Sequence, residues 1–312
     1  MRCTRCQAPL EHGDIRCPVC AFPSEVEVAG EAAAMKVLRC PECNAALAYS
    51  AEKQNAACGF CGCVMKVEEP VDPIETPSAR LPLLVQAEQA KGSLRQWLST
   101  RGFFTPGDLA TAATVDTIHP LWWAAWVCDA KATVSWTADS NAGSGRSDWA
   151  PHSGKHTLEW SNLVVPATRG LSAHETNVLT GSYDVSRLEP VPDGAAQVEQ
   201  FDVQRSAARK TVIEGIERDA AERLKGGSIP GNRFRNVHVS ALLERLTTRR
   251  LAFPAWVLAY RFNGKLYRAV VHGQKADVVI GTSPISWAKV VLVGLGVLAA
   301  IALIAVAVRQ FA

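Results

Sequence analysis

The sequence predicts an α+β fold in which a mainly antiparallel sheet is preceded by a cysteine-rich region and followed by an apolar helix. Three observations lead to this prediction. Four Cys-x-x-Cys pairs lie within the first 61 of the 312 residues. Six of the nine tryptophans fall between residues 122 and 160, in segments with a strand-like alternation of apolar residues. The residues from Val290 to Val308 include no charged residue, Asn, Gln or Pro.

The cysteine pairs have the spacing of two metal-binding ribbons in tandem. Ten residues separate the first two pairs, and fourteen separate the last two. Each pair forms a tight knuckle, and two knuckles so spaced bring four thiolates to one tetrahedral zinc ion. We therefore predict two structural Zn²⁺ ions, one in a ribbon over residues 1–24 and one in a ribbon over residues 36–68. The predicted ligands are Cys3, Cys6, Cys17 and Cys20 in the first ribbon and Cys40, Cys43, Cys58 and Cys61 in the second.

Two cysteines lie outside these pairs. Cys63 is an alternative fourth ligand of the second ribbon, but we prefer Cys61, because a gap of two residues after Cys58 forms the knuckle. Cys128 lies in an apolar segment and is expected to be a small core residue. Disulfides are the alternative for the paired cysteines, and they are disfavoured because no secretory signal precedes them.

Proline spacing predicts a linker over residues 69–84. Prolines occupy positions 70, 73, 77 and 82 with acidic residues between them, and such a segment is expected to be extended. Residues 85–98 then show a loose apolar face typical of a helix. A Pro-Gly-Asp turn leads from there to a second short helix at 109–113. These helices begin an α+β domain that we place at residues 85–284.

The centre of this domain is β-rich. Strands are predicted over 119–138 and 155–165, with the tryptophans mainly in the core. Asn263-Gly264 predicts a hairpin that joins residues 255–262 to 266–272. A faint repeat, Pro-x-Trp-x-x-Ala-aromatic, begins at Pro120 and again at Pro254. If the repeat is more than chance, two similar hairpins pair into one sheet.

The longest helix of this domain is predicted over residues 203–224. Its apolar residues recur at spacings of three and four, and Gly226-Gly227 ends it. The opposite face, which includes Arg205 and Arg209, is expected to be solvated. The histidine pair His152 and His156 would share a helix face, but the surrounding Pro, Ser and Gly favour a loop, which argues against a metal site there.

The C-terminal apolar run predicts a transmembrane helix, which we place at residues 288–308. The nineteen residues from Val290 rise about 28 Å as a helix, close to the thickness of a bilayer core. Lys289 and Arg309 flank the run. The sequence thus predicts a tail-anchored, single-pass protein in a bacterial inner membrane, with the lipid bilayer as a partner. Because zinc thiolates require a reducing compartment, the N-terminal bulk is expected in the cytoplasm.

Charge and motifs argue against several functions. The net charge is +3, from 33 basic and 30 acidic residues, so no strong field favours nucleic acid. The sequence contains no phosphate-binding Gly-x-x-x-x-Gly-Lys-Ser/Thr loop, no His-Glu-x-x-His and no Gly-x-Ser-x-Gly. Saturated zinc ligands leave no open catalytic position. We therefore expect no enzymatic activity and no cofactor besides zinc.

Several motifs resemble a group of bacterial membrane proteins. They are the tandem ribbons, Pro254-Ala-Trp256-Val-Leu-Ala-Tyr260, Gly264-Lys265-x-Tyr267, His272-Gly273-Gln274, Gly281-x-Ser283-Pro284 and Ser286-Trp287-x-Lys289. The chain is similar in these motifs to TFIIB-type zinc-ribbon membrane proteins, some of which carry the label primosomal protein N′-like. The resemblance implies protein partners such as the PspA-like and SPFH-domain proteins of membrane-stress systems.

Together these features predict a membrane-anchored zinc-ribbon adaptor that recruits cytoplasmic proteins to the inner membrane face. A membrane-tethered nucleic-acid-binding ribbon protein is the alternative. The two hypotheses differ in the expected salt dependence of binding, because phosphate contacts release counterions.

Overall fold

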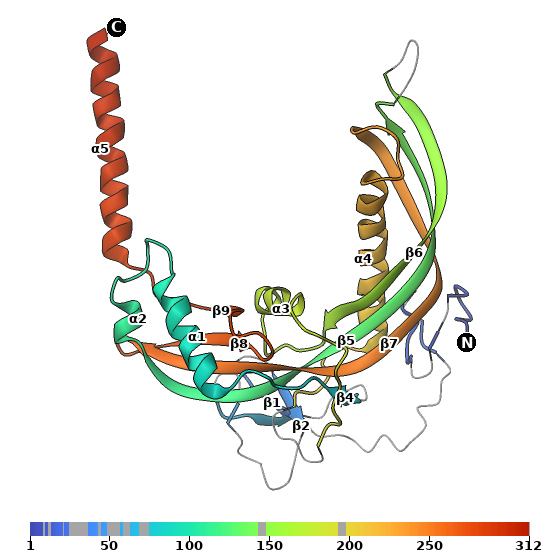
Figure 1. The fold of residues 1–312 in the computed structure, drawn as a ribbon, viewed down its shortest axis with the longest axis horizontal. Helices are drawn as coiled ribbons and strands as arrows, with labels where there is room; N and C mark the ends of the chain where they lie inside the picture. Colours follow the sequence, from blue (N-terminus) through green and yellow to red (C-terminus); the bar gives the residue numbers. More distant parts are fainter. Residues whose placement is uncertain are drawn as a thin grey trace.

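The described part of the protein contains two mainly antiparallel sheets and five helices (Figure 1). The structure is a computed structural model, and within the last helix it describes side chains up to residue 301. The predicted α+β class with a mainly antiparallel sheet is confirmed. The described residues are 1–8, 10–11, 14–20, 22–24, 37–42, 45–48, 57–58, 63–68, 75–142, 148–192 and 198–311.

The larger sheet is built on three very long strands. Its order is β6-β5-β7-β8-β9, with β4 paired in parallel to β7, and every other neighbouring pair is antiparallel. The central pair runs from Thr114↔Arg261 to Ser140↔Phe234. The strands are β4 (Ala79–Arg80), β5 (Thr114–Ser140), β6 (Ala150–Pro166), β7 (Phe234–Phe262), β8 (Lys265–His272) and β9 (Val279–Gly281).

The three long strands curve through a wide arc, and α4 (Arg205–Lys225) lies on its concave side (Figure 1). We call this three-stranded part the arm; it comprises residues 128–140 of β5 with the facing parts of β6 and β7. Along the arm, every second residue of β5 is buried beneath α4, including Val134 and Trp136. Period-two burial of this kind is what a sheet with one covered face produces.

The centre of the sheet is covered on both faces. All residues from Leu121 to Cys128 are buried, as are those from Leu251 to Leu258. Trp123 stacks on Phe253 of the neighbouring strand with ring centroids 4.8 Å apart, and neither side chain is exposed. The tryptophans of this stretch are therefore core residues, as the sequence predicted.

The Pro-x-Trp repeat corresponds to a real structural relation. Its two copies lie on β5 and β7 and pair with each other, since Trp122 faces Pro254 and Pro120 faces Trp256. The two repeat tryptophans make equivalent hydrogen bonds: Trp122 Nε1 donates to the Leu81 carbonyl at 3.0 Å, and Trp256 Nε1 donates to the carbonyl of Val85 at 2.8 Å. The hairpins β5/β6 and β7/β8 thus pair into one sheet.

The predicted Asn-Gly hairpin is present between β7 and β8. Asn263 (φ 49°) and Gly264 (φ 75°) both lie in the left-handed region, and Phe262 pairs with Lys265 across the turn. Both positions of a type I′ turn require positive φ, which Asn and Gly adopt most readily.

The predicted N-terminal helices of the domain pack against the end of the sheet formed by β7, β8 and β9. They are α1 (Ala87–Ser99) and α2 (Leu109–Ala112). Leu94 and Leu98 of α1 are buried against Leu258 and Tyr260 of β7. A further short helix, α3 (Ala173–Thr180), begins at Ser172 with a capping box to Glu175.

Gly273 ends β8 where the chain approaches the backbone of Pro254. Its carbonyl accepts hydrogen bonds from the amides of Leu84 and Val85, both at 2.9 Å. A Cβ atom at this position would lie 2.4 Å from the Pro254 oxygen, a distance that the rigid backbone on both sides cannot relieve locally.

We therefore expect Gly273→Ala to destabilise the protein by about 1–3 kcal/mol through overpacking. The measurement is the free energy of urea-induced unfolding. Gly102→Ala is the matched control, because a Cβ there meets no atom within 4 Å. Equal stabilities for the two variants would contradict the close approach at Gly273.

The prediction of a transmembrane helix over residues 288–308 is wrong. Among the described residues, no helix is both long and apolar enough to cross a membrane. A helix, α5 (Trp287–Phe311), does form there. The sequence therefore located a helix at this position, but the prediction that this helix spans a membrane is overturned. The predicted tail-anchored, single-pass topology and inner-membrane location are overturned with it.

Candidate metal centre

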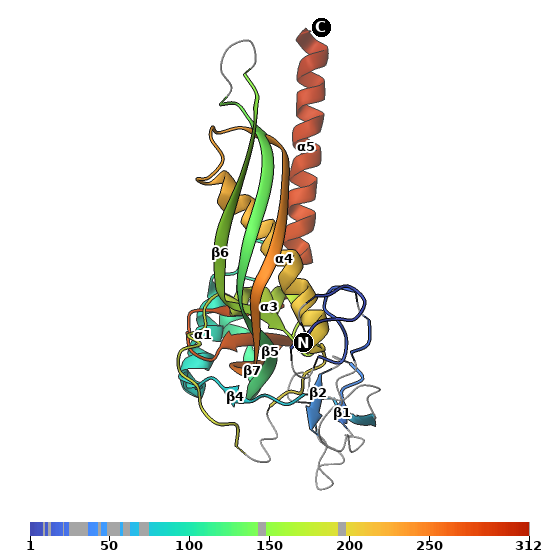
Figure 2. The same ribbon diagram turned by 90° about the vertical axis from the view of Figure 1, so that its right-hand side faces the viewer.

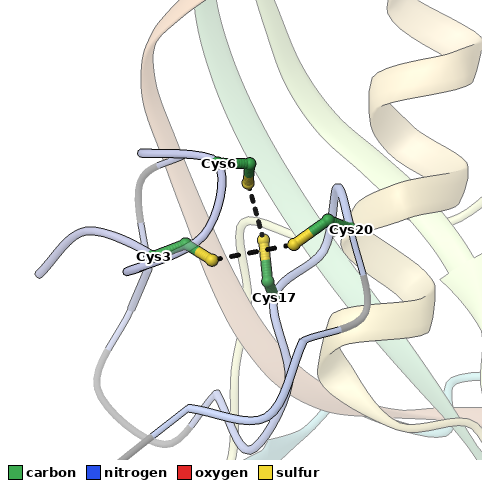
Figure 3. Close-up of side chains that lie close together, drawn as sticks. All are labelled: Cys3, Cys6, Cys17 and Cys20. Atoms are coloured by element: carbon green, nitrogen blue, oxygen red, sulfur yellow. Dashed lines mark hydrogen bonds between the residues drawn. The ribbon is translucent and has the colours of Figure 1, made fainter.

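Four thiols of the N-terminal segment meet at one point. The Sγ atoms of Cys3, Cys6, Cys17 and Cys20 all lie within 4.8 Å of one another. Figure 3 shows two of the sulfur–sulfur contacts crossing at the centre of the cluster: Cys3 to Cys20 at 3.7 Å and Cys6 to Cys17 at 3.5 Å. The first predicted ligand set is therefore assembled as the spacing indicated, and it could hold one metal ion.

The geometry fits a tetrahedral ion. Zinc–sulfur bonds of about 2.3 Å place the sulfurs of a tetrahedron roughly 3.8 Å apart, which is close to the two separations above. All four donors are thiols, which favours a soft or borderline metal such as zinc over magnesium or calcium. The donors come from both ends of a short loop, so that the ion would close the segment on itself.

A backbone hydrogen bond shapes each knuckle. The amide of Cys3 donates to the Ala8 carbonyl at 2.9 Å, and the amide of Cys17 donates to that of Phe22 at 2.8 Å. Both bonds run from a cysteine to the residue five positions later. In the second knuckle, the amide of Val19 also approaches the Cys17 sulfur at 3.4 Å, which favours a negatively charged sulfur.

The thiols of the cluster influence one another's protonation. The Cys6 amide donates to the sulfur of Cys3 and contributes most to lowering its pKa, to about 7. For Cys6, the amide of Ala8 lowers the pKa, but desolvation and the neighbouring thiols raise it to about 12 overall. Thiolates this close repel one another unless a cation lies between them, so metal binding would release protons.

The first ribbon is attached to the long helix by a buried ion pair. Arg209 of α4 donates from Nη1 to Oδ2 of Asp14, and both side chains are almost fully buried. The same oxygen accepts from the amide of Glu11 at 2.9 Å. Burial raises the pKa of Asp14, while the Arg209 charge opposes this shift. The expectation of a solvated position is wrong for Arg209, because this residue meets the ribbon, whereas Glu217 and Arg218 of the same helix are exposed as predicted.

The second ribbon forms a small sheet of its own. Its strands β1 (Val37–Arg39), β2 (Ala46–Ala48) and β3 (Lys66–Glu68) are antiparallel, with β1 in the middle. Figure 1 shows β1 and β2 on the convex side of the larger sheet, beneath its centre. Its buried residues Leu38 and Met65 belong to the same hydrophobic cluster as Trp123 and Phe253.

Half of the second predicted ligand set lies in the described part of the chain. Cys40 and Cys58 are buried, whereas Cys43 and Cys61 lie outside the described residues. The Cys40 amide donates to the Ala45 carbonyl at 3.0 Å, and the Cys58 amide to that of Cys63 at 2.8 Å. These two bonds repeat the five-residue pattern of the first ribbon. Cys63 is half-buried and provides the carbonyl that closes the last knuckle.

A strap of residues 198–203 joins the second ribbon to the sheet. The Gln200 amide donates to the carbonyl of Ala46 at 2.9 Å, and Asp202 forms an ion pair with Arg39 at 2.9 Å. Glu199 is fully buried in the strap, where its Oε1 accepts from the Gly170 amide at 3.3 Å. Burial raises the pKa of Glu199 to about 8, so this carboxyl is mainly protonated at neutral pH.

The raised pKa predicts a pH dependence of stability. The folded state holds the Glu199 proton more tightly than the unfolded state does. The contribution of this carboxyl to the free energy of unfolding is therefore fully present below about pH 4.5 and is lost as the pH rises through about 8. We expect Glu199→Gln to remove this loss, so that the wild-type protein loses stability relative to the variant between pH 5 and pH 9. Urea unfolding of both proteins across that range measures it.

The control for this prediction is Glu217→Gln on the exposed face of α4. Its stability difference from the wild-type protein should stay nearly constant over the same pH range. If the stability difference between Glu199→Gln and the wild-type protein is equally constant with pH, the Glu199 carboxyl is ionised in the folded protein.

Other side chains singled out in the sequence have structural roles. Cys128 is fully buried on the face of β5 that meets α4. Burial raises the pKa of its thiol to about 11, which makes it unreactive. His152 and His156 lie on strand β6 rather than in a loop. Four residues of strand separate them by about 13 Å, too far to share an ion.

These features define an α+β protein with a four-thiol cluster that could bind one metal ion. Comparisons with known proteins add no assignment to this class: no protein-family model matches the chain, and neither a curated protein nor a solved structure is similar to it at a significant level.

Proposed function

We propose that the protein is a non-enzymatic zinc-ribbon adaptor that binds protein partners. The cluster of Cys3, Cys6, Cys17 and Cys20 carries this proposal. Four thiolates saturate a tetrahedral zinc ion, which then serves as a structural cross-link without an open position for catalysis. The second ribbon holds a second zinc ion through Cys40, Cys43, Cys58 and Cys61, which the two repeated knuckle bonds support.

The ribbons are suited to presentation of a binding surface because they are held on a rigid body. The first ribbon is attached through Asp14 and Arg209, and the second through the strap of residues 198–203. PspA-like and SPFH-domain proteins, the partners that the sequence resemblance implies, are the first candidates to test.

Metal content tests the zinc part of the proposal. The full-length protein should contain two zinc ions per chain by inductively coupled plasma mass spectrometry. We expect one ion after Cys3→Ser/Cys6→Ser and one after Cys40→Ser/Cys43→Ser. Cys63→Ser is the matched control and should retain both ions; the loss of one would make Cys63 a ligand in place of Cys61.

Affinity purification with the same variants tests the adaptor role. A discrete protein that is recovered with the wild-type chain and with Cys63→Ser, but lost with one double variant, supports the proposal and shows which ribbon binds it. Equal recovery with all variants would place the binding surface outside the ribbons. Nucleic acid bound with an affinity that falls steeply with salt would favour the nucleic-acid alternative and contradict the adaptor.

A further inference from the structure

The outer edge of strand β6 is an open pairing surface. Figure 2 shows β5 between β6 and β7 along the arm, with β6 on one side of it. No described strand pairs with the outer edge of β6. The regular part of the strand is bounded by Pro151, which lacks an amide hydrogen, and by a bulge at Asn162 (φ 57°). A free edge of this length is a template for another strand.

The face of β6 turned away from α4 has a symmetrical arrangement of side chains. Lys155, Thr157 and Glu159 alternate on this face, opposite Ser135, Thr133 and Lys131 of β5, and all three are exposed. None of the described acidic residues forms an ion pair with Lys155. A basic and an acidic residue thus stand at equal distances on either side of one threonine.

We propose that this edge pairs with the same edge of a second copy of the chain, in antiparallel register about Thr157. A two-fold axis at that residue places each Thr157 opposite its counterpart in the other copy. Lys155 of each copy then faces Glu159 of the other, and Ser153 faces Ser161. Threonine pairs and opposite charges in directly facing positions both stabilise antiparallel strands.

The charges select this register over its neighbours. A shift that pairs Lys155 with its own counterpart, or Glu159 with its own counterpart, brings like charges together. A shift by a single residue would place the polar side chains of the second copy on the side of the sheet that carries α4. The buried side chains of the arm exclude this register. Only the register about Thr157 joins two basic–acidic pairs at once.

Pairing would extend an existing row of charges across the arm. Glu159 lies 3.4 Å from Lys131 of β5, which in turn lies 3.9 Å from Glu244 of β7. Lys155 of the second copy would continue this alternation on the other side of Glu159. The sheet would then run without interruption from β7 of one copy to β7 of the other.

One hydrogen bond on the edge of β6 must break for the two copies to pair. Arg223 of α4 donates to the Glu159 carbonyl at 3.3 Å, which indicates that this carbonyl points away from β5. Backbone groups alternate in direction along a strand, so the carbonyls of Lys155 and Thr157 point outward as well. In the register about Thr157, these outward groups face one another. Arg223 keeps its ion pair with Asp219 when it releases the carbonyl.

Charge reversal in the full-length protein tests the proposal. Sedimentation equilibrium should show a reversible dimer of the wild-type chain. Lys155→Glu or Glu159→Lys alone places like charges opposite each other twice and should weaken the dimer about tenfold. The double variant Lys155→Glu/Glu159→Lys restores opposite charges and should return the association to near the wild-type value. Restoration by the double variant separates a direct contact from misfolding of the arm.

Hydrogen exchange supplies an independent readout. The outward amides of residues 153 to 159 should become protected as the protein concentration rises. A monomer at all concentrations would overturn the proposal. So would a dimer that is insensitive to both single reversals, because the contact would then lie elsewhere, for example on the exposed apolar residues of α5. Protection that requires a different protein would assign the edge to that partner and would also overturn it.

Discussion

Cys3→Ser/Cys6→Ser is expected to unfold the first ribbon and release it from α4 while the long sheet stays folded. Only a few described residues of this segment, among them Cys3, Cys17 and Asp14, are buried, so it has almost no hydrophobic core. Structural zinc contributes on the order of 10–16 kcal/mol to the folding of peptides of this kind. Without two of its four ligands, the segment loses the interaction that offsets the entropy of ordering it.

Hydrogen exchange followed by mass spectrometry measures this effect. Amides of residues 1–24 should lose protection in the double variant, whereas the amides of β5 and β7 should keep it. A metal chelator should produce the same pattern in the wild-type protein. Cys63→Ser is the control, since Cys63 is in the second ribbon. Full protection of residues 1–24 in the double variant would show that the ribbon folds without its metal.

Arg209→Met is expected to cost about 3–5 kcal/mol of the docking free energy of the first ribbon. The substitution leaves Asp14 buried without its cation, and an uncompensated buried charge is strongly destabilising. The measurement is the rate of limited proteolysis within residues 1–24, together with their hydrogen exchange. Both should increase, even though the four cysteines are intact.

Two further variants sharpen this prediction. Asp14→Leu/Arg209→Met removes both charges and should recover much of the lost docking energy, as replacement of buried ion pairs by apolar residues commonly does. Arg218→Ala removes an exposed arginine of the same helix and should leave docking unchanged. If Arg209→Met behaves like Arg218→Ala, then the ribbon does not depend on the pair.

The sequence predicted the features that depend on local pattern. The cysteine spacing located the four-thiol cluster, because the conformation of a knuckle depends on the residues within it. The Asn263-Gly264 turn and the periodicity of α4 were also sufficient, since turn conformation and helix amphipathicity are local properties. The Pro-x-Trp repeat indicated that the two hairpins share one sheet, although not that its copies face each other.

The sequence did not predict how the parts dock. Arg209 is a charged residue on the polar face of a predicted helix, where solvent exposure is expected. Nothing near it in the sequence indicates that Asp14 lies against it. Glu199 likewise becomes buried only because the strap passes between the ribbon and the sheet. Both cases depend on contacts between residues far apart in the sequence. The transmembrane prediction failed for a different reason: it took one run of apolar residues as sufficient for a membrane span, whereas no helix among the described residues has both the length and the apolar character that a span requires.

The extent of the β5–β7 pairing has a consequence for how the protein is made. Thr114 pairs with Arg261, so one end of the central ladder cannot form until Arg261 has left the ribosome. The contacts of the first ribbon cluster, in contrast, lie within its own loop and become available early in synthesis. Sheets dominated by such distant pairs fold slowly, and their strands stay exposed to aggregation meanwhile. The pairing of these long strands must therefore be complete before the surface that holds both ribbons exists.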